Sequence, residues 1–182
     1  MEFNIQEKPD KYREAIRRWV LAYDWSIALS YTFTFSEIIA ASEKWTMKNT
    51  QYFFNCVDRG VYRTLQRRKG LRCQRFNILE QGKQGENFHI HGIIAVPTDD
   101  KAKPEYRSLN GLRGLMRHVW LNKMICNRQI IPHRFEIKDV NFGSYSPEKW
   151  ISYITKDVNQ GDFETSNLAV PGSIRFGATH LR

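Results

Sequence analysis

The fold is decided by residues 88 to 96, which read Phe88-His89-Ile90-His91-Gly92-Ile93-Ile94-Ala95-Val96. Such a short, mainly apolar run is typical of a buried strand. Alternate side chains of a strand share one face, about 6.8 Å apart along the backbone, so His89 and His91 point to the same side and Ile90 to the other. Two imidazoles on one face can bind one cation, and the run therefore predicts a metal site.

A third ligand is available in the strand-like run that precedes this one. Residues 71 to 80 end in Glu80, and residues 81 to 87 between the two runs are polar and contain glycine, as expected of a hairpin turn. A symmetric turn pairs residues whose numbers add up to 169, which places Glu80 opposite His89 on the same face. A slip of one residue would move Glu80 to the other face.

Glu80, His89 and His91 form a donor set suited to a divalent metal ion. One carboxylate and two imidazoles with open coordination positions fit Mg²⁺ or Mn²⁺ acting on a phosphate. The alternative is that both histidines are structural and that Glu80 is a solvated strand end. We expect the metal site, because the hairpin register brings the carboxylate to the imidazoles.

Composition indicates where such a phosphate would come from. The 182 residues carry 28 lysines and arginines against 19 acidic residues, a formal charge of +9 that favours a polyanionic partner such as nucleic acid. Three cysteines without a Cys-x-x-Cys pair indicate neither a disulfide framework nor a zinc ribbon. No apolar run approaches the length of a membrane span and no secretion signal is evident, so we expect an intracellular protein that does not bind membranes.

Strand and helix patterns alternate along a single domain, residues 1–182, with a core of about 25–158 and a C-terminal extension of 159–182. We expect strands at 25–35, 71–80, 88–96 and 131–140, and helices at 9–24, 46–69, 105–125 and 146–157. The order β-α-β-β-α-β, with an extra helix at each end, predicts an α+β fold. Its sheet would be a largely antiparallel split βαβ sheet of about five strands, ferredoxin-like or RRM-like, with helices packed on one side.

The last helix carries a second group of polar residues. Ser146 followed by Pro147 is a strong helix start, with serine as the N-cap and proline at the first helical position. Apolar residues then fall on one arc that would pack on the sheet: Trp150, Ile151, Ile154 and Val158. Tyr153 is expected at the edge of this arc, with Lys156 beside it one turn on. The alternative is a boundary tyrosine and a solvated lysine.

Together these segments resemble the HUH endonucleases, and among them the Rep proteins that initiate rolling-circle replication of plasmids, phages and small single-stranded DNA viruses. The resemblance covers about residues 27 to 157. The run His89-Ile90-His91 matches the His-hydrophobic-His motif, and Glu80 stands where many such proteins carry the third metal ligand. The run Tyr153-Ile154-Thr155-Lys156 matches the Tyr-x-x-Lys nucleophile motif, and residues 30 to 35 loosely match the Thr-rich first motif.

The resemblance implies metal-dependent, sequence-specific nicking and joining of single-stranded DNA at the stem-loop of a replication origin. Tyr153 would attack the DNA and form a 5′-phosphotyrosine intermediate, while Lys156 would favour the phenolate or hold the scissile phosphate. Two-tyrosine members carry a second tyrosine four residues away, but Lys149 and Asp157 occupy those positions, which favours a single nucleophile. The protein would act in the cytoplasm of a prokaryotic host, or in the nucleus if it comes from a eukaryotic virus, with host replication proteins as further partners.

Two other interpretations remain open. A single-tyrosine transposase or plasmid relaxase would share this chemistry, although relaxases tend to carry three histidines where this chain offers Glu80. A non-catalytic module that binds origin DNA would use the histidines only structurally. Many viral relatives add a helicase domain with a G-x-x-x-x-G-K-[ST] loop, and no such sequence occurs in these 182 residues.

Basic side chains that could hold DNA are densest in one part of the chain. The candidates, to which we add Lys149 of the last helix, are Arg63, Arg67, Arg68, Lys69 and Arg72. They end the second expected helix and lead into the next strand, where they could track a phosphate backbone. An equally good interpretation is a solvated helix end whose cations complement the helix dipole.

Overall fold

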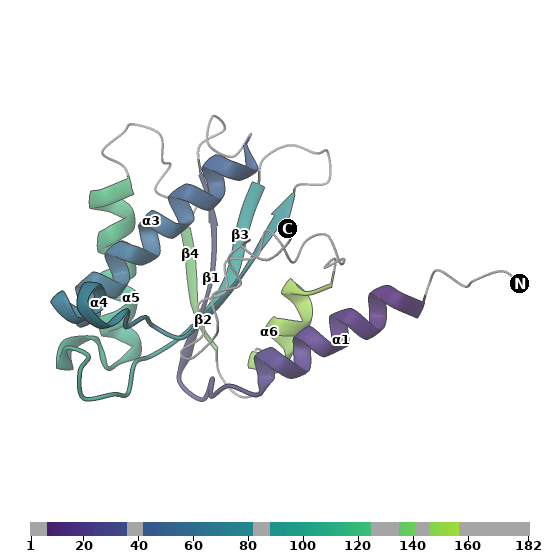
Figure 1. The fold of residues 1–182 in the computed structure, drawn as a ribbon, viewed down its shortest axis with the longest axis horizontal. Helices are drawn as coiled ribbons and strands as arrows, with labels where there is room; N and C mark the ends of the chain where they lie inside the picture. The colour runs from purple at the N-terminus through teal and green to yellow at the C-terminus, as the bar shows by residue number, and fades with distance from the viewer. Residues whose placement is uncertain (1–6, 36–41, 82–87, 125–134, 141–145, 157–182) are drawn as a thin grey trace, which may run out of the picture.

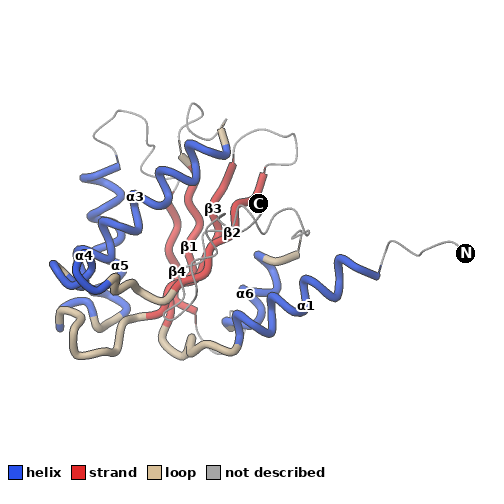
Figure 2. Tube along the Cα trace, in the orientation of Figure 1, coloured by secondary structure: helices blue, strands red, loops and turns tan. Residues whose placement is uncertain are grey.

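A four-stranded antiparallel sheet forms the centre of the protein (Figure 2). The computed structural model describes residues 7–35, 42–81, 88–124, 135–140 and 146–156. The sheet has the order β2-β3-β1-β4, and its strands are β1 (Ala28–Thr34), β2 (Arg75–Gln81), β3 (Phe88–Ala95) and β4 (Phe135–Val140). The α+β class is as expected. Each of the four strand-like runs contributes one strand, and the described residues contain no fifth strand.

The register of the β2–β3 pair agrees with the hairpin expected from the sequence. Glu80 lies opposite His89, and Ile78 lies opposite His91, as the symmetric turn requires. The turn itself, residues 82–87, lies outside the described residues. Because a strand alternates its side chains between faces, this register puts the carboxylate and both imidazoles on the same face of the sheet.

Helices cover both faces of the sheet, which corrects the expectation of helices on one side (Figure 1). One face packs against α3 (Glu43–Tyr62), α4 (Thr64–Lys69) and α5 (Leu109–Val119), and the other against α1 (Glu7–Leu21) and α6 (Pro147–Ile154). A 3-10 turn at Pro104–Tyr106 precedes α5, and a π-helical turn at Trp120–Met124 follows it. Helices are needed on both faces because Ile93 and Ile94 of β3 point to opposite faces of the sheet and are both fully buried.

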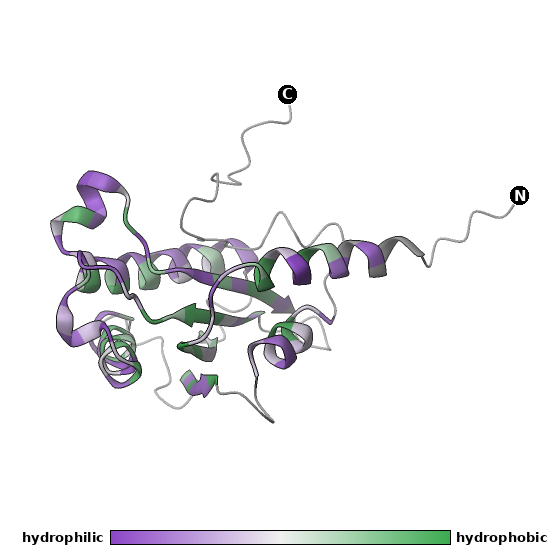
Figure 3. Ribbon diagram, turned by 90° about the horizontal axis from the view of Figure 1, so that it is seen from below, coloured by the Kyte–Doolittle hydropathy of each residue, from purple (hydrophilic) through white to green (hydrophobic). Residues whose placement is uncertain are grey.

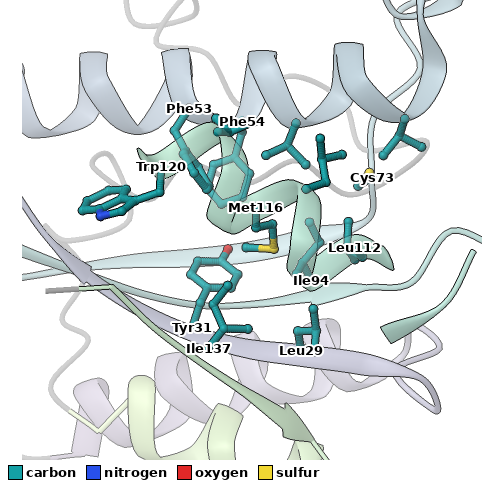
Figure 4. Packing of buried hydrophobic residues seen from close by; sticks show 14 of the residues in the cluster. Leu29, Tyr31, Phe53, Phe54, Cys73, Ile94, Leu112, Met116, Trp120 and Ile137 are labelled. Atoms are coloured by element: carbon teal, nitrogen blue, oxygen red, sulfur yellow. The ribbon is translucent and has the colours of Figure 1, made fainter. Parts of the chain in front are cut away.

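The core on the α3 and α5 face is rich in aromatic rings (Figure 4). Phe33 of β1 lies 5.4 Å from the ring of Phe53 and 5.4 Å from that of Trp120, measured between ring centroids. On the opposite face a smaller core joins α1 and α6 to the sheet through Val20, Ile93 and Ile151. Figure 3 shows hydrophobic residues along the strands and an alternation of hydrophobic and hydrophilic residues along α1.

The second expected helix is interrupted. Instead of one helix to Lys69, α3 ends at Tyr62 and α4 starts at Thr64, with Arg63 between them at a φ of 51°. The fourth expected strand is described from Phe135 to Val140, and residues 125–134, which include its expected start at 131, lie outside the described residues. Among the described residues, no helix is long and apolar enough to cross a membrane.

Gly92, which follows the second histidine, is required by a close approach of side chains from both neighbouring strands. Tyr31 on β1 and Asn77 on β2 both lie opposite Gly92. The buried Tyr31 hydroxyl passes over the glycine and donates a hydrogen bond to Asn77 Oδ1. A Cβ atom at Gly92 would collide with the Tyr31 ring and hydroxyl.

We therefore expect Gly92→Ala to lower the free energy of unfolding by about 1–3 kcal/mol, because an extra methyl group in a packed core forces its neighbours to shift. Urea denaturation measures the change. The matched control is Gly114→Ala on α5, where a new Cβ meets no atom within 4 Å. This control should raise the stability by up to about 1 kcal/mol, since alanine favours helices. Equal effects of the two substitutions would contradict the steric account.

Candidate metal and nucleophile site

Two neighbouring strands bring the three expected metal ligands to one face of the sheet. Glu80 is near the end of β2, and His89 and His91 are near the start of β3. His91 Nε2 lies 3.0 Å from Glu80 Oε2, so that the imidazole and the carboxylate are in hydrogen-bond contact. The side chain of His91 is largely buried, whereas that of Glu80 is 30% exposed. The pair therefore sits at the edge of the core with access from solvent.

Two threonines of β1 contact the other nitrogen of each imidazole. Thr32 Oγ1 lies 2.9 Å from His91 Nδ1, and Thr34 Oγ1 lies 2.6 Å from His89 Nδ1. Both contacts follow from the register, which places Thr32 opposite His91 and Thr34 opposite His89. A hydroxyl can either donate or accept, so it can serve either imidazole tautomer. When Nδ1–H donates to threonine, Nε2 has a lone pair for a metal ion.

These threonines are site residues that the sequence analysis missed. They belong to the loosely matching Thr-rich motif, and nothing in that motif connects them with the histidines. The signal that could have found them is the spacing itself, since Thr-x-Thr on one strand matches His-x-His on another. Using it requires knowing that β1 pairs with β3, which local sequence does not reveal.

The environment of His91 favours the neutral imidazole. Burial lowers the pKa of His91 below its ordinary value, while the neighbouring Glu80 carboxylate acts in the opposite direction. Neutral imidazole is the form that binds a metal ion. The donor set of one carboxylate and two imidazoles thus fits a divalent ion in its chemistry. Within the described part of the chain, however, no three His, Cys, Asp or Glu side chains are grouped closely enough to hold one as they stand, and the complete ligand set stays a prediction.

Helix α6 carries Tyr153 to the same face. Its start follows the expected pattern, with the Ser146 hydroxyl accepting a hydrogen bond from the backbone N–H of Lys149. Trp150 Nε1 donates to the carbonyl oxygen of Gly92 at 2.9 Å, which fixes the helix to β3 directly after His91. The Tyr153 ring stacks on Trp150 with a centroid distance of 5.5 Å and lies 6.3 Å from the His91 ring. At 48% exposure, Tyr153 is accessible at the rim of the core, as expected.

Lys156 connects the nucleophile candidate with the acidic ligand. Helix α6 ends at Ile154 rather than continuing to Asp157, so Lys156 lies in the turn that follows. Its Nζ is 3.8 Å from Glu80 Oε1 and 4.3 Å from the centre of the Tyr153 ring. The structure therefore brings together Glu80, His91, Tyr153 and Lys156, and it places His89 directly opposite Glu80 on the neighbouring strand.

The C-terminal end of α6 is held by an arginine of α1. Arg17 Nε donates to Thr155 Oγ1 at 3.0 Å, and its NH2 group donates to the carbonyl oxygen of Ser152 at 3.2 Å. A cation at this end of a helix also complements the helix dipole. The role of Arg17 could not be predicted from the sequence, because its contact spans 138 residues and leaves no local pattern.

The basic cluster expected to bind DNA lies elsewhere. Arg63 and the α4 residues Arg67, Arg68 and Lys69 are exposed, but they belong to the helical layer on the other face of the sheet. Arg72 is directed inward, with Nε 3.5 Å from Asp58 Oδ2. Asp58 is fully buried and also pairs with Arg75 of β2, so this network joins α3 to the start of β2. Of the expected DNA-binding residues, only Lys149 shares α6 with Tyr153.

We expect Thr32→Val to weaken Mn²⁺ binding by about 10- to 100-fold, because the loss of a hydrogen bond to a ligating imidazole lets the ring turn. Isothermal titration calorimetry measures the affinity. Thr32→Ser keeps the hydroxyl and should bind nearly as well as the original protein. Ser30→Ala is the control, since Ser30 lies on the same face of β1 but donates to the Lys138 carbonyl oxygen instead. Unchanged affinity in Thr32→Val would show that the threonine does not orient His91.

Replacing Arg17 by methionine should loosen the end of α6. The substitution leaves the Ser152 carbonyl and the Thr155 hydroxyl without their charged donor, and such a hydrogen bond is worth about 1.5–3 kcal/mol. We expect the backbone amides of Thr155 and Lys156 to exchange about 10- to 100-fold faster in native-state hydrogen exchange. Arg18→Met is the control, because Arg18 is exposed and its side chain pairs with Glu14 of the same helix. Equal exchange in the two variants would exclude a clamp by Arg17.

Comparison with known proteins does not identify a family for this chain. No protein-family model matches the chain, and no similar protein was found among curated proteins or among solved structures. The resemblance to the HUH endonucleases therefore rests on the motifs in the sequence. The structural feature that bears on function is the group of contacts among Glu80, His91, Tyr153 and Lys156.

Proposed function

We propose that this chain is an HUH-type endonuclease and strand transferase of the single-tyrosine class, which acts on single-stranded DNA at a rolling-circle replication origin. The observation that carries the proposal is the approach of Lys156 to two groups at once, the Glu80 carboxylate at 3.8 Å and the Tyr153 ring at 4.3 Å. Glu80 in turn contacts His91. Residues of two separate motifs, far apart in sequence, thus form one continuous group on an accessible face.

The strand order supports the same proposal. Strand β3 lies between β1 and β2 and runs antiparallel to both, while α3 and α4 connect β1 to β2. This is the order of a split βαβ sheet, in which the inserted strand occupies the centre. In the proposed HUH-type fold, the central strand carries the histidines and a helix after the last strand carries the tyrosine.

The proposed reaction is a transfer of a phosphoryl group to tyrosine and back. The Tyr153 hydroxyl oxygen bonds to the phosphorus as the bond from phosphorus to O3′ breaks, and O3′ leaves with a proton as a free 3′-hydroxyl. The downstream strand stays attached to Tyr153 through the phosphate at its 5′ end, as a 5′-phosphotyrosine. Attack by a 3′-hydroxyl reverses the exchange, so joining needs no ATP, because one phosphate ester is exchanged for another.

The other residues of the site would stabilise negative charge or hold the reacting groups in position. A divalent ion bound by Glu80, His89 and His91 would polarise the phosphate oxygens and offset charge that develops in the transition state. Lys156 adds a positive charge beside the Tyr153 ring, where it reduces the repulsion between the phosphate and the approaching oxygen. Thr32 and Thr34 orient the imidazoles, and Trp150 and Arg17 hold the helix that carries the nucleophile.

The test is covalent trapping. We expect the protein, incubated with Mn²⁺ and a labelled single-stranded oligonucleotide that carries its origin sequence, to form an adduct that survives denaturing electrophoresis. Where that origin is not yet known, a pool of random oligonucleotides serves as substrate. Tyr153→Phe should reduce the adduct by at least about 10³-fold, because it removes the attacking oxygen. An adduct that persists in Tyr153→Phe would exclude this nucleophile.

Two further measurements separate the competing functions. Chelation of the metal, or His91→Ala, should also suppress the adduct, and full activity under either condition would overturn the metal assignment while leaving Tyr153 in place. A protein that binds the oligonucleotide but never forms an adduct is a non-catalytic binding module. A transposase or relaxase would form the same adduct, but on transposon ends or a transfer origin instead of a replication origin.

A further inference from the structure

The outer surface of α3 and α4 has an unusual charge composition. Residues 44–69 contain seven lysines and arginines, and every one of them is exposed: Lys44, Lys48, Arg59, Arg63, Arg67, Arg68 and Lys69. The same stretch contains one acidic residue, Asp58, which is fully buried in ion pairs with Arg72 and Arg75. The first residue of α3, Glu43, is also exposed, so this surface carries seven cations against one exposed carboxylate.

Two large aromatic side chains lie on the same surface. Trp45 is 53% exposed and Tyr52 is 50% exposed, although residues of this size are usually buried. At 100° per residue, Trp45, Lys48, Tyr52 and Arg59 fall within an arc of about 60° on α3, so they form one stripe about 21 Å long. Lys48 Nζ lies 4.9 Å from the centre of the Trp45 ring. The stripe thus alternates aromatic and cationic groups.

We propose that this stripe, together with Arg63 and Arg67, is a second binding surface for single-stranded nucleic acid, separate from the nicking site; we call it the α3–α4 surface. Exposed rings stack on unpaired bases of any sequence, and neighbouring cations hold the phosphates. A duplex hides its base faces, so the aromatic groups select a single strand. The charge composition favours a polyanion such as nucleic acid, since seven exposed cations on these helices outnumber the one exposed carboxylate, Glu43.

The position of the surface gives it a role that the nicking site does not have. The sheet separates it from Glu80 and Tyr153, which lie on the α1 and α6 face (Figure 1). Strand β1 ends at Thr34, opposite His89, and α3 begins near that end of the sheet and runs back along it (Figure 1). A strand leaving the nicking site can pass around this end of the sheet and continue along α3. The α3–α4 surface would then keep the DNA attached to the protein through contacts that do not depend on the reactive phosphate.

The test measures binding without cleavage. A labelled oligothymidylate of about 12 nucleotides without a stem-loop is titrated in EDTA at several salt concentrations, with anisotropy as the readout. Trp45→Ala combined with Tyr52→Ala keeps every charge, and we expect it to weaken binding at least about tenfold. The triple variant Lys48→Gln, Arg63→Gln, Arg67→Gln should lower the slope of log K against log salt by about 2, since each lost phosphate contact removes about 0.7.

Matched variants control for general effects on charge and folding. Leu121→Ala removes an exposed apolar side chain elsewhere, and the triple variant Arg18→Gln, Lys101→Gln, Arg117→Gln removes the same number of charges from other exposed positions. Both controls should stay within about twofold of the original affinity, and circular dichroism confirms that each variant is folded. In addition, the oligonucleotide should quench tryptophan fluorescence in the original protein, and Trp45→Phe should lose most of that quenching.

Each outcome decides the proposal. A loss of affinity in the aromatic variant and a lower slope in the charge variant, with both controls unchanged, support it. Unchanged affinity in the aromatic variant, or a duplex that binds as tightly as the single strand, overturns it. Because the measurement uses no divalent metal and no scissile site, it is independent of Tyr153 chemistry, so the nicking proposal and this one can fail separately.

Discussion

The site depends on the register of one central strand between its two neighbours. Strand β3 pairs with β2 so that Glu80 meets His89, and with β1 so that Thr32 and Thr34 meet the two histidines. Because side chains alternate with a period of two, a shift of one residue in either pairing would send one set of partners to the opposite face. The carboxylate, the imidazoles and the hydroxyls are therefore held together by backbone pairing, before any side chain contributes.

The two pairings differ in how well they can be predicted from sequence. The β2–β3 register follows from a short polar turn between two apolar runs, so local sequence is enough to place Glu80 opposite His89. The β1–β3 register joins strands more than fifty residues apart, and no local signal specifies it, which explains why the contacts of Thr32 and Thr34 were not expected. The pairing of β1 with β3 could not be predicted because the two strands are far apart along the chain.

Helix α6 shows a similar division. Its start at Ser146 and the burial of Trp150, Ile151 and Ile154 agree with the expected amphipathic pattern, while Val158 lies outside the described residues. The contact of Lys156 with Tyr153 agrees as well, although Lys156 lies in the turn after α6 and not on the helix. What the pattern could not show is the face of the sheet on which α6 packs, because an amphipathic helix fits either side of a sheet whose strands are apolar on both faces.

The contact between Arg17 and the end of α6 also has a consequence for the order in which the protein is made. Helix α1 leaves the ribosome before α6, and the groups that Arg17 binds, at Ser152 and Thr155, are synthesised 135 and 138 residues after it. Domains with many such distant contacts fold slowly, since a long loop must close before the contact forms. A nascent chain therefore cannot assemble the α1 and α6 layer until residues 152 to 155 have been synthesised, so a product truncated before α6 would lack this layer even when its sheet is already formed.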